Sequence, residues 1–237
     1  MGNVLVNDAY LYGIADALRE KHDTEKKYLP SEMEDAVRGI QSGGSVDWFQ
    51  YASSIQGMFS SVTFPENTEI ELNVPNVKNL GGTFQNSLNV KKVKIKGNVN
   101  GNAVRLNSCF WGASNLETID FSEFKCTFSD MSTAFRSCTS LKYIYGEFDC
   151  TSTTTLGGFL MLSSAVEYIR FKKETISVSL DLGQSPKLTD ETIQNIIDGL
   201  ADLTGQTAQT LALHNNVKDK IRAEQRAQAT SKNWNIA

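Results

Sequence analysis

Apolar residues in the middle of the chain recur in one order that is repeated four times. In this template, each copy contains four apolar residues: three residues separate the first from the second, five separate the second from the third, and two separate the third from the fourth. The second apolar residue of each copy is an anchor, and the anchors are 26, 25 and 25 residues apart. This regularity is typical of proteins in which each copy forms one coil stacked on the next. The anchors are Phe84, Phe110, Phe135 and Leu160.

The end of each copy alternates apolar and polar residues, which predicts a short strand with every second side chain pointing inward. Because one coil cannot bury its own apolar edge, we expect neighbouring strands to pair in a parallel sheet. In the third copy the last inward position is Gly146. A weaker leading copy places Phe59 25 residues before Phe84. The expected inward pairs are Val93 and Ile95, Ile119 and Phe121, and Ile169 and Phe171.

Residues 1–41 are predicted to form a two-helix module, which a linker at residues 42–54 separates from the repeats. Each helix has one apolar stripe, and the second begins at a capping box of Ser31 and Glu34. Helices this short cannot bury both stripes alone, so we expect them to attach to a larger assembly or to oligomerise, for example as a trimer. The alternative is a cap over the first coil. The expected assembly face comprises Leu11, Ile14, Leu18, Met33, Val37 and Ile40.

Residues 183–237 are predicted to close the C-terminal end of the repeats, which occupy residues 55–182. Thr189 is a candidate N-cap for a helix that carries five aliphatic residues. A strand at 211–213, a helix at about 216–229 and a strand at 234–236 follow. This helix-strand-helix-strand order would cover the exposed edge of the sheet. The aliphatic residues are Ile193, Ile196, Ile197, Leu200 and Leu203.

The core of the repeat resembles a known family. The pattern F-xx-C/S-x-x-L-xx-I, clearest in residues 135–144, is similar to the BspA-like (treponemal-type) leucine-rich repeats of bacterial and phage surface proteins. The resemblance covers about residues 55–171, and the chain departs from it at Gly146 and in its irregular spacing. It implies an α/β repeat fold, a leucine-rich-repeat solenoid with short parallel strands.

The two ends resemble segments of phage proteins. Residues 14–40 are similar to the amino-terminal segment of tail-associated proteins from phages and prophages of Gram-positive bacteria, and residues 188–213 to the carboxy-terminal segment of leucine-rich phage and gut-bacterial proteins. These resemblances imply a structural component of a phage tail, baseplate or fibre, located in the virion and assembled in the host cytoplasm. Its helices would bind other tail proteins, and its solenoid would bind a host-surface protein or glycan. The alternative is a secreted or cell-surface bacterial adhesin.

Composition narrows the choice of partners. The chain has 23 Lys and Arg against 27 Asp and Glu, a net charge of −4, so nucleic acid is not an expected partner. No apolar run reaches the length of a membrane helix, and the first residues lack the basic and apolar regions of a secretory signal. The cysteines form no CxxC pair, which favours buried packing residues over a zinc site. They are Cys109, Cys126, Cys138 and Cys150.

The sequence contains no familiar catalytic motif, and we expect no cofactor or metal. His22 and His214 stand apart from any nucleophile or metal ligand, so we expect surface or capping roles for them. A glycosidase needs two acids that face one cleft, whereas we expect the candidate carboxylates to face solvent on different coils. The prediction is therefore a non-enzymatic protein, with a glycan-cleaving tail enzyme as the alternative. The candidate carboxylates are Asp120, Glu123, Asp130, Glu147 and Asp149.

Outward residues of the strands should form two columns on the sheet face. Three tyrosines gather there beside an arginine and an aspartate, a combination typical of surfaces that recognise proteins or glycans. The alternative is that stacked tyrosines only stabilise the strands. Trp111 is expected on a turn edge, where it either packs over the next coil or projects as a contact. The candidate recognition face comprises Asp120, Tyr143, Tyr145, Tyr168 and Arg170.

Overall fold

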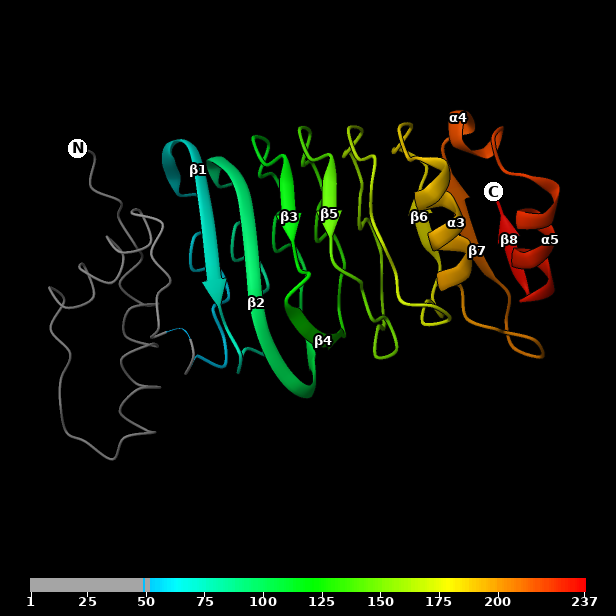
Figure 1. Ribbon diagram of the computed structural model, residues 1–237, viewed down its shortest axis with the longest axis horizontal. Helices are drawn as coiled ribbons and strands as arrows, with labels where there is room; N and C mark the ends of the chain where they lie inside the picture. Colours follow the sequence, from blue (N-terminus) through cyan, green and yellow to red (C-terminus); the bar gives the residue numbers. More distant parts are fainter. Residues whose placement is uncertain (1–48, 50–51) are drawn as a thin grey trace, which may run out of the picture.

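The computed structural model describes residue 49 and residues 52–237. In this part, the chain winds through successive coils that lie side by side along one long axis (Figure 1). None of its helices is long and apolar enough to cross a lipid bilayer. The two-helix module at residues 1–41 and most of the linker lie outside the described residues. So do the six residues of the expected assembly face, Leu11, Ile14, Leu18, Met33, Val37 and Ile40.

A five-stranded parallel sheet runs along most of the coils. Its main path consists of β1 (Thr63–Asn73), β2 (Leu88–Val104), β3 (Thr118–Asp120) and β5 (Tyr143–Tyr145), and β4 (Phe124–Phe128) pairs with β2. The register places Val93, Ile119 and Ile144 side by side, and all three are buried. The predicted inward alternation of these strands is therefore confirmed.

Two strands differ in length from the expected pattern. β2 contains 17 residues, because its second half continues beyond the inward pair and bonds to β4 on both sides of a register shift between Asn98 and Ala103. In the fourth copy, the expected strand at 169–171 is reduced to single bridges at its two ends, one of which joins Phe171 to Phe148. Both pairings are parallel, so the order of the coils continues through them.

The core of the coils contains a column of phenylalanine rings. Phe59, Phe84, Phe110 and Phe135 stack with successive ring centroids 5.2, 5.3 and 5.6 Å apart. The column confirms the register of 25 to 26 residues, and the place of Phe59 in it confirms the leading copy. In the fourth copy Phe159, which precedes the anchor, meets Phe135 edge-on at 5.1 Å.

The third copy departs from the template at Gly146, and Phe148 compensates for the missing side chain. Gly146 has a φ of +98°, and a Cβ atom there would lie 2.7 Å from the carbonyl carbon of Phe121. Phe148 is buried instead, with its ring centroid 5.5 Å from that of Phe121 and 5.9 Å from that of Phe171. The apolar side chain expected two residues after Ile144 is therefore supplied four residues after it.

The C-terminal end forms a second parallel sheet with three strands. β6 lies within the expected repeat region, but its partner strands lie within residues 183–237, so the two regions share this sheet. Three helices accompany the strands in this part of the chain (Figure 1). The elements are β6 (Leu180–Leu182), α3 (Asp190–Gly199), β7 (Gln209–Leu213), α4 (Asn215–Lys218), α5 (Ala223–Ser231) and β8 (Trp234–Ile236).

The first helix of this end begins as predicted. The Thr189 hydroxyl accepts a hydrogen bond from the backbone N–H of Thr192 and so caps α3. The helix is shorter than expected because it ends at Gly199, and Leu200 leaves it to bridge to Ile176. Leu203 is buried beyond the helix.

The prediction of a single helix at about 216–229 is wrong, because the chain forms two helices there, α4 and α5. Arg222 has extended backbone angles, and its N–H donates to Gln225 Oε1 at 2.9 Å, which starts α5. The break between α4 and α5 brings Ile221 against the hydrophobic core. The expected strands at 211–213 and 234–236 are both present.

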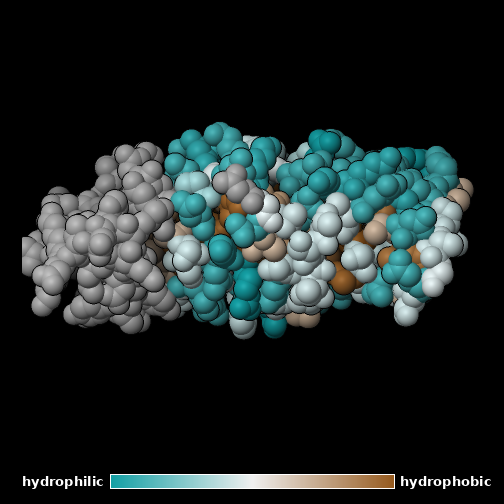
Figure 2. Space-filling view, turned by 90° about the horizontal axis from the view of Figure 1, so that it is seen from below, coloured by the Kyte–Doolittle hydropathy of each residue, from teal (hydrophilic) through white to brown (hydrophobic). Residues whose placement is uncertain are grey.

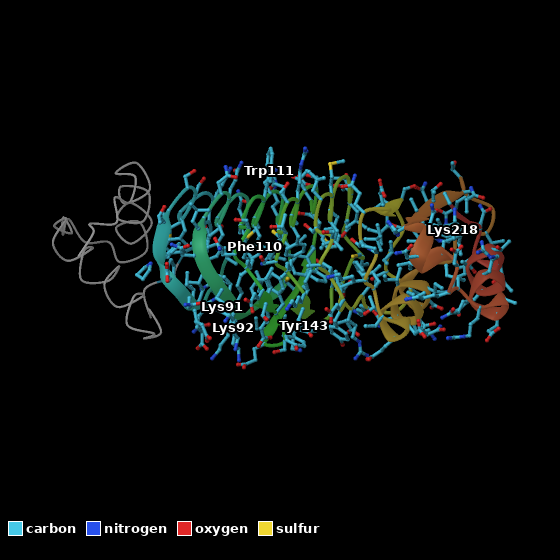
Figure 3. All side chains as sticks on the ribbon, turned by 90° about the horizontal axis from the view of Figure 1, so that it is seen from above. Lys91, Lys92, Phe110, Trp111, Tyr143 and Lys218 are labelled. Atoms are coloured by element: carbon cyan, nitrogen blue, oxygen red, sulfur yellow. The ribbon has the colours of Figure 1, made fainter. Side chains whose placement is uncertain are left out.

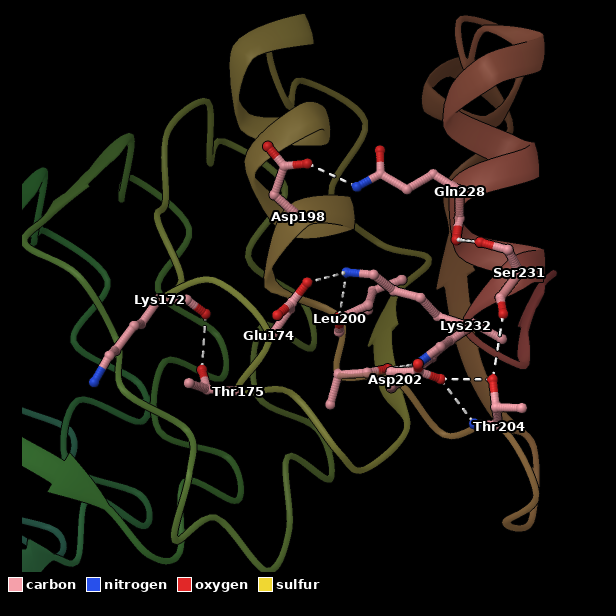
Figure 4. A network of polar contacts seen from close by, with 12 residues as sticks. Lys172, Glu174, Thr175, Asp198, Leu200, Asp202, Thr204, Gln228, Ser231 and Lys232 are labelled. Carbon is pink, nitrogen blue, oxygen red and sulfur yellow. Dashed lines mark hydrogen bonds and ion pairs between the residues drawn. The ribbon is translucent and has the colours of Figure 1, made fainter.

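A polar network joins the last coil to the C-terminal segment (Figure 4). Lys232 Nζ donates to the carbonyl oxygen of Leu200 at 2.8 Å and lies 3.6 Å from a carboxylate oxygen of Glu174. Gln228 Nε2 donates to Asp198 Oδ1 at 2.8 Å. Through these contacts, the end of α5 is held against α3 and against the coil that contains Glu174.

Candidate functional site

The outward residues of the sheet form two columns, as the sequence predicted. In Figure 3, Lys92 and Tyr143 project from one side of the molecule, and Trp111 lies on the opposite side. A charged region therefore leads along this face into an aromatic one. One column holds Lys92, Thr118, Tyr143 and Tyr168, and the other holds Lys94, Asp120 and Tyr145.

Three tyrosines form a continuous group, which we call the tyrosine cluster: Tyr143, Tyr145 and Tyr168. The rings of Tyr143 and Tyr145 are stacked with centroids 5.9 Å apart, and Tyr168 lies 5.8 Å from Tyr145. Tyr145 is 43% exposed, while the other two are half-buried. The Tyr143 hydroxyl donates to Glu167 Oε2 at 3.2 Å, and the charge of Glu167 raises the pKa of Tyr143. The cluster thus presents partly fixed rings to solvent.

The two charged residues of the candidate recognition face have partners within the protein. Ser122 donates its N–H and its hydroxyl to Asp120 Oδ1, at 2.8 and 2.6 Å, and Lys94 Nζ lies 3.9 Å from Asp120 Oδ2. Arg170 Nε lies 3.4 Å from Glu147 Oε1. The structure therefore places Asp120 beside Tyr145 and directs Arg170 to Glu147, so the exposed rings are the main feature of this face.

A pocket of about 350 Å³ opens next to this face, between the second half of β2, β4 and the two coils that follow. We call it the lower pocket, because β4 lies at the lower edge of the molecule in Figure 1. Seen from that side, patches of apolar surface lie between hydrophilic side chains (Figure 2). The lining includes Phe121, Phe124, Lys125, Glu147, Asp149 and Lys172.

The prediction that the candidate carboxylates face solvent on different coils is wrong in part. Glu147 does face solvent, with 47% of its side chain exposed, but it lies on the same coil as Asp149, whose side chain is only 16% exposed, and both line the lower pocket. Asp149 is also held by neighbours: its Oδ2 lies 2.6 Å from Lys172 Nζ, and Thr151 donates its N–H and hydroxyl to Oδ1. Partial burial acts to raise the pKa of Asp149, but these hydrogen bonds outweigh it and the pKa is lowered. Asp149 is therefore suited to remain ionised rather than to donate a proton.

This arrangement gives a testable pH dependence. Because the carboxyl pKa of Asp149 is lower in the folded than in the unfolded state, ionised Asp149 stabilises the folded protein at pH values above its ordinary pKa of 3.8. That contribution is lost as the pH falls through the folded-state pKa. We expect the urea concentration at the unfolding midpoint of the wild type to decrease when the pH is lowered below about 4. Asp149→Asn should have a lower midpoint than the wild type at pH 7, and its midpoint should decrease less as the pH is lowered. Equal slopes in the two proteins would contradict the role of Asp149.

Other residues singled out in the sequence have structural roles where the structure describes them, and His22 lies outside the described residues. Trp111 packs over the next coil, with the Arg136 guanidinium carbon 5.1 Å from its ring centroid. His214 caps α4, because its Nδ1 accepts from the N–H of Asn216 at 3.1 Å. All four cysteines are free, and burial raises their thiol pKa, to about 12 for Cys150. The described residues contain no group of three or more His, Cys, Asp or Glu placed to hold a metal ion.

Sequence reasoning missed the lower pocket because its lining comes from four separate segments that share no motif. Comparison with known proteins adds no relative: no family model, no curated protein and no solved structure matches this chain.

Proposed function

We propose that this chain is a non-enzymatic structural component of a phage or phage-like tail, in the baseplate or a fibre, and that it resides in the virion. Its leucine-rich-repeat solenoid would display a face that binds the host surface. Three resemblances support this proposal: that of the repeats to bacterial and phage surface proteins, that of residues 14–40 to phage tail-associated proteins, and that of residues 188–213 to leucine-rich phage and gut-bacterial proteins. The parallel pairing of successive coils supports the solenoid class. Residues 1–41 would attach the chain to other tail proteins or to its own copies.

The observation that carries the proposal is the tyrosine cluster. A large aromatic side chain on a rigid strand loses little conformational freedom when it binds, and such side chains dominate the energy of many recognition surfaces. Here the rings lie on one continuous face, and Tyr145 remains 43% exposed. Ring stacking between Tyr143 and Tyr145 is also what a purely structural ladder would give, so the two roles need an experiment to separate them.

Electron microscopy of purified particles with a labelled chain tests the location. We expect label on the tail, at the end that meets the host cell. Particles of normal infectivity that contain none of this chain would refute the tail proposal and leave the adhesin as the better reading.

Removal of two rings tests the role of the face. We expect Tyr143→Ala combined with Tyr168→Ala to weaken binding to host cells by about tenfold or more, as the loss of a central aromatic contact does, with the thermal midpoint lowered by only a few degrees. Binding is measured by pull-down of the purified chain on whole cells. Leu162→Ala is the control, because Leu162 is 51% exposed and lies on a turn outside the sheet face.

A large loss of stability with unchanged binding would instead show that the tyrosines serve only to hold the strands together. Both variants should therefore be compared by thermal unfolding before binding is measured.

A further inference from the structure

The lower pocket adjoins the tyrosine cluster and shares side chains with the charges around it. Glu147 lines the pocket, follows Tyr145 by two residues and pairs with Arg170. Ser122 also lines the pocket and donates to Asp120. The pocket volume of about 350 Å³ falls within the range of small-ligand sites, roughly 300–1,000 Å³. A ligand that extends beyond the pocket would therefore meet the tyrosine rings.

The charges around the pocket balance. Lys125 and Lys172 supply two cations, and Glu147 and Asp149 supply two carboxylates. An anion would meet the carboxylates and a metal ion would meet the ammonium groups, so neither fits the lining as a whole. A neutral ligand with several hydroxyls does fit, because each hydroxyl can donate to a carboxylate and accept from an ammonium.

The remaining lining has the same amphipathic character. Phe121 and Phe124 lie at the bottom of the pocket, where only a small edge of each ring is exposed, 3% and 5% of the residue surface. Thr127, also in the lining, has a hydroxyl without a hydrogen-bond partner among the described residues. Buried polar atoms normally have a partner, but this oxygen has almost no accessible surface, so a ligand hydroxyl would reach it only after the Thr127 side chain rotates towards the pocket. A sugar ring carries C–H groups on its face and hydroxyls around its edge, so it can contact both the apolar and the polar residues of the lining.

We propose that the lower pocket binds a neutral sugar residue of a host-surface glycan and that the next sugar of the chain stacks on Tyr145, the most exposed ring of the tyrosine cluster. This inference rests on the proposed host-binding function. The proposed function leaves open whether the ligand is a protein or a glycan; this inference specifies a glycan and places it at the lower pocket and Tyr145.

A second hollow, of about 240 Å³, provides a comparison within the same chain. Its lining contains one lysine and two glutamates, and the charged atoms of Lys91 and Glu117 lie 3.8 Å apart. The residues that line it include no aromatic side chain. Since this hollow is smaller, carries an excess of one carboxylate and has no aromatic residue in its lining, it should not hold a neutral sugar, and its Lys91–Glu117 pair makes a control.

The test is a titration of the ¹⁵N-labelled full chain, followed by amide NMR, with neutral disaccharides of glucose, galactose, mannose and N-acetylhexosamines. Inorganic phosphate and glucuronate are the charged comparators. We expect at least one neutral disaccharide to shift amides in residues 121–127 and 145–149. Glu147→Gln combined with Lys125→Met should weaken this binding about fivefold or more, because each removes a charge-assisted hydrogen bond.

The control variant, Lys91→Met combined with Glu117→Gln, should leave binding within about twofold of the wild type. All four side chains are at the surface, and unchanged amide spectra elsewhere would show that both variants are folded. A response to phosphate or glucuronate alone, no response to any neutral disaccharide, or an equal loss in both double variants would overturn the sugar proposal.

The same set of measurements keeps the two proposals apart. Sugar binding at the lower pocket by a chain that is absent from virions would refute the tail function and support the ligand class. Cell binding that depends on the tyrosine cluster but is unaffected by the pocket variant would support host recognition and refute the pocket. Release of reducing sugar during the titration would support the ligand class and overturn the non-enzymatic part of the proposed function.

Discussion

Phe110→Ala is expected to lower the free energy of unfolding by about 3–5 kcal/mol, the range for truncation of a large buried aromatic residue. Phe110 has no exposed surface and stacks between Phe84 and Phe135, with interplanar angles of 3° and 12°. Its loss removes two stacked ring contacts at once and leaves a cavity between coils that are tied together by backbone hydrogen bonds, so the site cannot easily collapse. Urea unfolding followed by fluorescence measures the change.

The control for this variant is Leu162→Ala, in which an exposed aliphatic residue is truncated. Because Leu162 is 51% exposed, its loss should change the free energy of unfolding by no more than about 0.5 kcal/mol. Similar effects of the two substitutions would mean that the phenylalanine column is not the main source of stability.

The second large effect is expected at Gly146. Gly146→Ala places a Cβ atom 2.7 Å from the carbonyl carbon of Phe121, at a φ of +98° that residues with side chains rarely adopt. The backbone strain costs about 1–2 kcal/mol, and the steric overlap adds about 1–3 kcal/mol because the neighbouring backbone must move. We expect a total loss of about 2–5 kcal/mol, again measured by urea unfolding.

Gly205→Ala separates these two contributions. Gly205 has a similar positive φ of +79°, but a Cβ atom there would meet nothing within 4 Å. It should therefore cost only the backbone strain, about 1–2 kcal/mol. An equal loss in the two variants would show that the contact with Phe121 does not matter.

The repeat register and the sheet face could be predicted from the sequence because both depend on local pattern. Spacing alone placed Phe84, Phe110 and Phe135 in one column, and the alternation of residues alone placed Tyr143 and Tyr145 on the outward side. Each of these features is set by the side chains of one copy and by contact with the next.

The features that the sequence did not reveal depend on how the backbone deviates from the repeat. The glycine and asparagine residues around Gly101 are typical of a turn, yet the chain continues through them as part of β2. Phe148 fills a core position that the template assigned to Gly146, because the chain bulges there. The lower pocket results from such deviations in neighbouring coils, and no single copy contains a signal for it.

The direction of the sheet has a mechanical consequence. Hydrogen bonds between the strands run along the long axis of the molecule. A force that pulls its two ends apart would therefore act mainly on the hydrogen bonds between one pair of neighbouring strands at a time. Coils would then open in sequence, because each contacts only its neighbours. A chain held at its N-terminal end and bound through the tyrosine cluster would carry this force between β1 and Tyr168. The sheet of β6, β7 and β8 would lie beyond the loaded part and keep its fold.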